Sequence, residues 1–275
     1  MARALRTIYT IWLRESVTFW RERGRMIGMV GQPLLYLFIL GNGITAGLRL
    51  NNVTSVGYIQ FLYPGVIALA VLFTSLFSAI SIIWDREFGF LKEVLVAPVP
   101  RWAVAVGKAF GGATVALVQA AIMVVMAPFV GISLSVTVVV ALLVLSFLMS
   151  LAVTGLGVAI ASRMASMQSF QMIMNFLIMP LYFLSGAMFP LTSAPTWLRV
   201  LMTADPLTYG VDALRNVVFS GTMVGTGSAA RSLLEVGREG GLVRWPLGFD
   251  VVLMLVVTIA FIGFGAWQFS RAQAA

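Results

Sequence analysis

The residue types that this chain lacks limit the chemistry that it could perform. It contains neither cysteine nor histidine, so thiol nucleophiles, imidazole bases, disulfides and the common zinc ligand sets are excluded. Gly107 and Lys108 form its one Gly-Lys pair, but Ala109 follows them and the upstream glycine of a phosphate-binding loop is missing. We therefore predict no catalytic residue, no metal site and no cofactor bound by this chain, and energy for any work must come from another subunit.

The apolar segments carry a few uncharged polar side chains and almost no ionisable ones. Proton-coupled and ion-coupled transporters usually keep such groups in mid-membrane, whereas Lys108 and Asp250 lie only near the ends of apolar segments. This pattern argues against a secondary transporter or an ion pump. The uncharged polar side chains either form hydrogen bonds between helices or line a translocation path. The path candidates are Gln32, Tyr36, Asn42, Gln171, Asn175 and Tyr182.

A short segment of alternating charged and aromatic residues, 84–101, lies between two apolar segments and ends in Pro-Val-Pro-Arg. It is richer in phenylalanine than a solvated connector requires. We predict an amphipathic helix that docks on a partner protein. Its candidate contact residues are Arg86, Glu87, Phe88, Gly89, Phe90, Leu91 and Lys92.

A second segment, residues 191–250, predicts a helical hairpin followed by an exposed loop over residues 220–248. Asp205 is placed to cap a helix whose first residue is Pro206. That helix carries an apolar stripe, and we expect Arg215 to lie off the stripe and to hold the hairpin in position. The alternative is a solvated surface arginine. The stripe consists of Leu207, Val211, Leu214 and Val218.

The composition predicts an all-α integral membrane protein with a single domain, residues 1–275. Apolar residues make up 60% of the chain and charged residues only 10%, with a mean hydropathy of +0.98, so lipid must be the solvent for much of its surface. Residues 109–162 carry no charge and as one helix would be about 80 Å long, so they must cross twice, with a break at 128–133. The six predicted spans are residues 26–48, 61–83, 104–128, 134–161, 171–190 and 251–270.

Lysine and arginine in the short flanking segments predict the orientation. They gather before the first span, around the second and third, between the fourth and fifth, and after the sixth. Both termini are therefore expected in the cytoplasm of a cell that carries the protein in its plasma or inner membrane. Residues 1–25 read as an amphipathic helix on the membrane surface, with a disordered basic tail as the alternative. The net charge of +8 fits lipid headgroups, and no nucleic-acid partner is expected.

Two stretches resemble type-2 ABC exporter permeases. One runs through the fifth predicted span and the hairpin, and the other resembles the coupling helix of that family. Residues 91–112, LKEVLVAPVPRWAVAVGKAFGG, and residues 205–215, DPLTYGVDALR, are most similar to its daunorubicin-resistance-type drug exporter branch. The matching residues are Ile178, Leu181, Leu184-Ser185, Ala187, Ala194-Pro195, Pro206-Leu207, Tyr209 and Arg215 in the first stretch, and Arg86 to Leu95 with Pro98-Val99-Pro100-Arg101 in the second.

The resemblance implies a permease half-transporter. Two copies, expected as a homodimer, would line a path for a small-molecule substrate, and two ABC ATPase subunits that hold ATP and magnesium would dock on the coupling helices. The hairpin would close the exit as an extracellular gate, with Asp205, Pro206, Tyr209 and Arg215 as its residues. Amphipathic drugs or lipid-like small molecules are the expected substrates. A lipid-linked polysaccharide exporter, a non-transporting membrane anchor and a passive channel remain as alternatives.

Overall fold

The structure, a computed structural model, describes residues 2–22, 58–90, 99–224 and 231–272, together with isolated helical positions at 28, 31, 33, 35 and 39. The predicted first span, residues 26–48, therefore lies almost entirely outside the described residues. Within the described residues, five helices are long and apolar enough to cross a membrane. The prediction of an all-helical integral membrane protein is confirmed.

The first described span combines α3 (Tyr58–Ser78) and α4 (Ile80–Glu87), which are separated only by a turn at Ala79. The other spans are α6 (Arg101–Val125), α7 (Val136–Ala161), α8 (Met167–Leu184) and α12 (Leu247–Ala272). Residues 84–87, which were predicted to open a separate cytosolic helix, are instead the last turn of α4. That helix ends at Glu87, with Phe88 as its C-cap, because Gly89 then adopts a positive φ of 79°.

Local sequence signals account for the breaks between spans. The 3₁₀ turn η1 (Ala127–Val130) follows α6 and ends at Gly131 in the left-handed conformation, within the predicted break at residues 128–133. Ser135 then caps α7 by accepting a hydrogen bond from the Val138 amide. Ser166 caps α8 in the same way, so this helix begins four residues before the predicted span at 171 and ends at Leu184.

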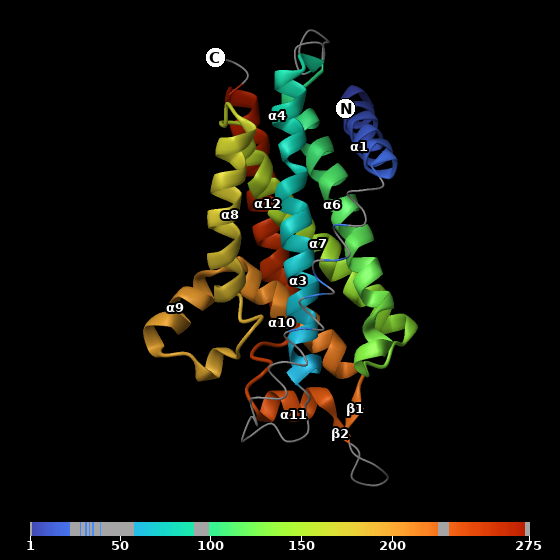
Figure 1. The fold of residues 1–275 in the computed structure, drawn as a ribbon, viewed down its shortest axis with the longest axis vertical. Coiled ribbons are helices and arrows are strands. Elements are labelled where there is room, and N and C mark those ends of the chain that lie inside the picture. The colour runs from blue at the N-terminus through green and yellow to red at the C-terminus, as the bar shows by residue number, and fades with distance from the viewer. Residues whose placement is uncertain are drawn as a thin grey trace.

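The long helices run side by side along the long axis, and both chain termini lie at one end of the bundle (Figure 1). We call this the terminal end. The helix α1 (Ala2–Arg21) lies beside α6 near this end. At the opposite hairpin end, α9 (Thr196–Ala204), α10 (Pro206–Ser220) and α11 (Leu233–Glu239) gather across the ends of the spans. Both ends of the chain thus lie at the same end of the bundle.

Close backbone contacts at small residues hold the bundle together. A Cβ atom at Gly265 of α12 would lie 2.6 Å from the carbonyl oxygen of Gly155 on α7, so neither helix tolerates a larger residue there. The helix α1 approaches α6 in the same manner: a Cβ atom at Gly107 would lie 2.8 Å from Ile11 Cβ, and one at Gly111 would lie 2.6 Å from Glu15 Cβ. The N-terminal helix is therefore docked on the bundle, which contradicts the alternative of a disordered basic tail.

The outward face of α1 remains apolar. Its exposed stripe repeats at helical spacing, while Ile11 and Phe19 are buried against the bundle. An amphipathic helix with exposed aliphatic and aromatic residues suits the boundary between headgroups and acyl chains. The exposed stripe consists of Leu5, Tyr9, Leu13, Val17 and Trp20.

The segment after α10 is more ordered than the exposed loop that the sequence predicts. The strands β1 (Met223–Val224) and β2 (Arg231–Ser232) pair antiparallel, with Met223 opposite Ser232. Ser232 then caps α11 through the Glu235 amide. Leu233, Leu242 and Val243 are buried in the same core as α10. Scattered glycines and charges suggested a loop because the apolar residues that anchor this segment are few and widely spaced.

Candidate functional site

At the terminal end, the last turn of α4 projects part of the predicted docking segment. Glu87 and Phe88 are exposed, and 82% of the Phe88 surface is accessible. A Cβ atom at Gly89 would meet nothing within 4 Å, so glycine is required here by its positive φ and not by crowding within this chain. Phe90 is the last described of the predicted contact residues, and Leu91 and Lys92 lie outside the described residues. Docking on an ATPase stays a prediction for all seven residues.

Arg86 fixes this end of α4 to a neighbouring turn of the bundle. Its two terminal nitrogens donate hydrogen bonds of 2.8 Å to the carbonyl oxygens of Met164 and Ser162, in the turn between α7 and α8. Trp84 on the same helix donates from Nε1 to the sulfur of Met167. Arg86 was predicted to contact a partner, but its guanidinium anchors the docking segment to the spans.

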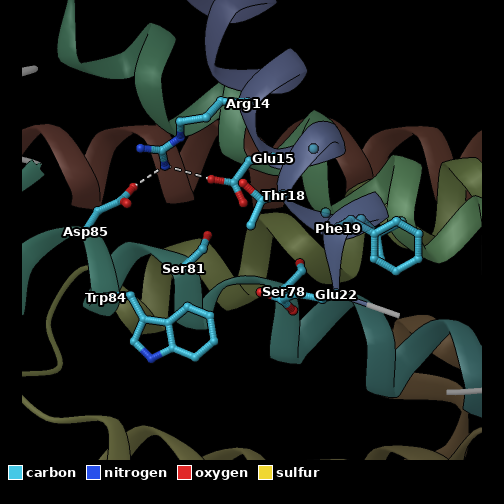
Figure 2. A pocket seen from close by; sticks show the side chains of 12 residues that line it. Arg14, Glu15, Thr18, Phe19, Glu22, Ser78, Ser81, Trp84 and Asp85 are labelled. Carbon is cyan, nitrogen blue, oxygen red and sulfur yellow. Dashed lines mark hydrogen bonds and ion pairs between the residues drawn. The ribbon is translucent and has the colours of Figure 1, made fainter. Parts of the chain in front are cut away.

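Among the residues that the structure describes, four charged side chains from three helices meet beside this segment, and we call them the charge cluster. Lys108 on α6 lies 2.6 Å from a Glu15 oxygen on α1 and 2.5 Å from an Asp85 oxygen on α4. Arg14 on α1 contacts the same two carboxylates, at 2.9 Å and 2.5 Å, and its guanidinium lies 4.0 Å over the Phe90 ring. Figure 2 shows Arg14 reaching from α1 between Glu15 and Asp85.

The electrostatics of the charge cluster follow from burial and pairing. Burial raises the pKa of Glu15, but attraction to Lys108 and hydrogen bonds from Lys108 and Arg14 outweigh it, so the pKa lies below its ordinary value. Burial lowers the pKa of Arg14, yet its bonds to Asp85 and Glu15 leave it raised. Two cations therefore neutralise two carboxylates, and the cluster ties α1 and α6 to the docking segment.

The charge cluster was not predicted from the sequence, in which Lys108 lies near a span end and no pattern marks Glu15 or Asp85. One signal was available: a lysine seven residues inside a helix with an apolar surrounding needs a carboxylate partner. Only the packing of α1 on α6 identifies that partner, because Glu15 lies 93 positions away in the sequence.

A pocket of about 190 Å³ opens beside the charge cluster. Its walls come from α1, α3, α4 and α6, and they combine charged, hydroxyl and aromatic side chains (Figure 2) with two glycines of α6. The described lining residues are Arg14, Glu15, Thr18, Phe19, Glu22, Ser78, Ser81, Trp84, Asp85, Gly111, Gly112 and Val115.

The predicted path residues separate onto two faces where the structure describes them. Gln171 and Asn175 lie on the exposed face of α8, together with the exposed Phe176. Tyr182 belongs instead to the buried stripe of that helix, which packs against the bundle. Gln32, Tyr36 and Asn42 lie outside the described residues. The path therefore stays a prediction, and Tyr182 is a packing residue within this chain.

At the hairpin end, the capping geometry agrees with the sequence. Asp205 accepts a hydrogen bond of 3.0 Å from the Leu207 amide, and Pro206 occupies the first helical position of α10. The Tyr209 hydroxyl donates a hydrogen bond of 2.8 Å to the Thr203 carbonyl oxygen, and this bond fixes α10 against α9. Burial raises the pKa of Asp205 to about 7, although the Leu207 amide favours the charged form.

Arg215 is fully buried, which contradicts the alternative of a solvated arginine. Its terminal nitrogens donate to the carbonyl oxygens of Gly186 at 2.9 Å and Leu242 at 3.2 Å. Its guanidinium lies 4.2 Å over the Phe61 ring of α3. Burial lowers the pKa of Arg215 to about 10, against the attraction of Asp212. This arginine joins α10 to α3, to the end of α8 and to the segment before α12, so it holds the hairpin in place as expected.

The structure also adds Asp212 to this end, a residue for which the sequence predicted no role. Its carboxylate accepts hydrogen bonds from the Trp245 amide at 3.0 Å and the Arg244 amide at 3.1 Å. It also attracts Arg215 electrostatically. Burial raises the pKa of Asp212, although these two amides and Arg215 lower it in part. The acceptor role could not be foreseen, because 32 residues separate Asp212 from Arg244.

Comparison with known proteins agrees with this arrangement. Residues 6–219 match the ABC-2 type transporter family. The chain is 29% identical over 215 residues to the putative transport permease ycf38 of Cyanophora paradoxa, covering 77% of this chain and 73% of the relative. It is 27% identical over 218 residues to nodulation protein J of Rhizobium leguminosarum bv. trifolii (78% and 82% covered) and 27% identical over 217 residues to the inner membrane transport permease YadH of Escherichia coli K12 (77% and 81%). With a family match that spans most of its length and a bundle of apolar helices, the chain belongs to the ABC-2 type transporter permeases.

Proposed function

We propose that this chain is the membrane subunit of an ATP-driven exporter that moves amphipathic drugs or lipid-like small molecules outward. Its family and the names of its relatives support a transport permease. Residues 91–112 and 205–215 support the daunorubicin-resistance-type branch. The basic flanks support an inner or plasma membrane location with both termini in the cytoplasm.

The observation that carries the proposal is the end of α4. A helix that leaves the bundle with an exposed carboxylate and an exposed phenylalanine, Glu87 and Phe88, offers a surface for a partner. Arg86 connects this surface to the turn between α7 and α8, and Asp85 connects it to α1 and α6. Two ATPase subunits, which hold the ATP and magnesium, would dock on the two copies of this surface. A displacement of α4 would then be transmitted through these contacts to α1, α6, α7 and α8.

The exposed face of α8 supports a homodimer. Met172, Phe176 and Met179 are exposed there beside the amides of Gln171 and Asn175. Two such faces across a two-fold axis would enclose an apolar path with a few polar groups. Since the chain has no cysteine, Asn175→Cys or Met179→Cys should cross-link between copies. A complex with one permease copy and no cross-link from α8 would contradict the homodimer.

The coupling surface is tested by Glu87→Ala and Gly89→Ala in the complex with its ATPase subunit. Glu87→Ala removes an exposed charge, and Gly89→Ala strains the positive φ of the turn. Each should lower permease-stimulated ATP hydrolysis by about tenfold, the effect of 1.4 kcal/mol in coupling, with insertion unchanged. Glu235→Ala is the matched control, because Glu235 is an exposed glutamate at the hairpin end. Parent-like hydrolysis and transport in both variants would favour a non-transporting anchor.

A further inference from the structure

The first turn of α12 contains a carboxyl group in an unusual environment. Asp250 is 0% exposed, and neither of its oxygens receives a hydrogen bond from the residues that the structure describes. The sequence placed this residue just outside the last span, at the membrane boundary. The structure includes it in a helix that is long and apolar enough to cross the membrane. An ionised carboxylate without donors is costly to bury, so the group requires an explanation.

The charged and titratable neighbours of Asp250 come from the elements packed around it. From α10, Asp212 repels it, and Tyr209 also interacts with it electrostatically. Arg215 and Arg244 face Asp212, and Arg244 is exposed. The helices α7 and α6 also pack on α12, but α7 has no ionisable residue and those of α6 lie in its first eight residues.

The hydrogen bonds divide the two aspartates into different roles. Asp212 accepts from two backbone amides and faces Arg215, and these contacts favour its charged form, although they offset only part of the effect of burial, which raises its pKa. Asp250 has no such donor among the described residues and lies in the field of Asp212. Two nearby carboxyls in one apolar site cannot both ionise at low cost, and one proton is then retained by the pair.

We propose that Asp212 and Asp250 form a proton-binding pair, with the proton held mainly on Asp250, that keeps α10 and the segment before α12 packed on α12. Separation of these elements would admit water to Asp250, which would then ionise and release its proton to solvent. Proton binding and the packed hairpin end therefore stabilise each other. The proposal concerns this packing alone and holds whatever the transported substrate is.

The direction of the pH dependence follows from linkage. The packed state binds a proton that the separated state loses at neutral pH, so the packed state is favoured at low pH and weakened as the pH rises. Val243 is a suitable reporter, because it is buried directly before Arg244 and Trp245, whose amides contact Asp212. The chain has no cysteine of its own, so Val243→Cys would be the only thiol.

The experiment measures maleimide labelling of Val243→Cys in the purified full chain in nanodiscs, between about pH 6 and pH 9. Each rate is divided by that of a small free thiol, which removes the pH dependence of thiolate formation. The corrected rate should rise at least about threefold over this range as Asp250 ionises. With Asp250→Asn, a neutral side chain of similar shape, it should stay flat and low. The control Glu235→Gln should keep the rise, since Glu235 is exposed.

A second variant keeps the test decisive if Asp250→Asn does not fold. Asp212→Asn removes the repulsion on Asp250 and should move the midpoint of the rise to lower pH, which loss of packing alone would not do. A flat parent profile, a rise that persists in Asp250→Asn, or an unmoved midpoint in Asp212→Asn would each overturn the proposal. No ATPase or substrate takes part, so these outcomes are separate from any failure of the exporter assignment.

Discussion

The two ends of the bundle bury charge in opposite ways. At the terminal end, Lys108 and Arg14 share the two carboxylates of Glu15 and Asp85, and each of the four has a partner within 3 Å. At the hairpin end, the buried ionisable groups among the described residues include Asp205, Asp212 and Asp250 but only one arginine, Arg215. The first cluster is balanced, and the second has an excess of carboxyls.

This difference gives the two ends opposite responses to pH. The pKa of Glu15 is lowered from 4.5, so the stability that it contributes is present above that value and is lost as the pH falls further. The pKa values of Asp205 and Asp212 are raised from 3.8, so their contribution is present below that value and is lost as the pH rises. The charge cluster at the terminal end is thus fully paired at neutral pH, whereas Asp205 at the hairpin end has a pKa of about 7 and changes its charge near neutral pH.

The largest expected effect is the loss of Lys108 from the charge cluster. Lys108→Met leaves Glu15 and Asp85 partly buried with Arg14 alone, and breaking a buried pair in this way costs about 3–5 kcal/mol. We expect a marked fall in the thermal unfolding temperature in detergent. Arg101→Met is the matched control, because Arg101 begins the same helix and is partly exposed.

The double variant Lys108→Met/Glu15→Gln sharpens this prediction. It removes the stranded carboxylate along with its partner, so part of the lost stability should return. If Lys108→Met unfolds like Arg101→Met, or if the double variant is less stable than the single one, the charge cluster does not hold α1 on the bundle.

The next effect in size is the loss of Arg215 from the hairpin end. Arg215→Met keeps the apolar stem but removes the donors to Gly186 and Leu242 and the cation that faces Asp212. Hydrogen bonds from a charged donor contribute about 1.5–3 kcal/mol each, so we expect a loss of about 3 kcal/mol. Protease resistance of the segment between α10 and α12 should fall first. Arg199→Met, on the more exposed α9, should have a smaller effect.

Sequence patterns predicted the parts of this fold that depend on local chemistry. The predicted break at residues 128–133 contains Gly131, which ends η1, and Asp205 with Pro206 begins α10 as predicted, because caps and turns are decided within a few residues. The residues of the predicted apolar stripe of α10 are buried, but so are Asp212, Arg215 and most of the other residues from 207 to 219, so the helical period did not reveal how deeply this helix is enclosed.

The arrangements that could not be predicted are those that join distant segments. The carbonyl partners of Arg215 lie 27 and 29 positions away, and those of Arg86 lie 76 and 78 positions away. Every residue has a backbone carbonyl group, so no sequence pattern shows which carbonyl will accept a hydrogen bond from an arginine. The last span was predicted to begin at residue 251, directly after the charge of Asp250. The helix α12 begins four residues earlier and therefore includes Asp250.

The smallest expected effect concerns Asp205, and it tests the pH contrast most directly. Asp205→Ala removes the cap of α10 and should lower stability by about 1 kcal/mol at acidic pH. Asp205→Asn keeps a side-chain oxygen that can accept the hydrogen bond from the Leu207 amide, but the new side chain cannot ionise. The pKa of about 7 lies above the ordinary 3.8, so the parent should lose stability as the pH rises through 7, and Asp205→Asn should lose less.

These two substitutions separate capping from ionisation, because only the second changes the pH profile without removing the acceptor. Unfolding temperatures at about pH 6 and pH 8, on either side of the pKa, provide the measurement. If Asp205→Asn follows the parent profile, the alkaline weakening belongs to Asp212 and Asp250 alone. If Glu15→Gln instead removes the alkaline weakening, the contrast between the two ends is wrong, because a lowered pKa can act only on the acidic side.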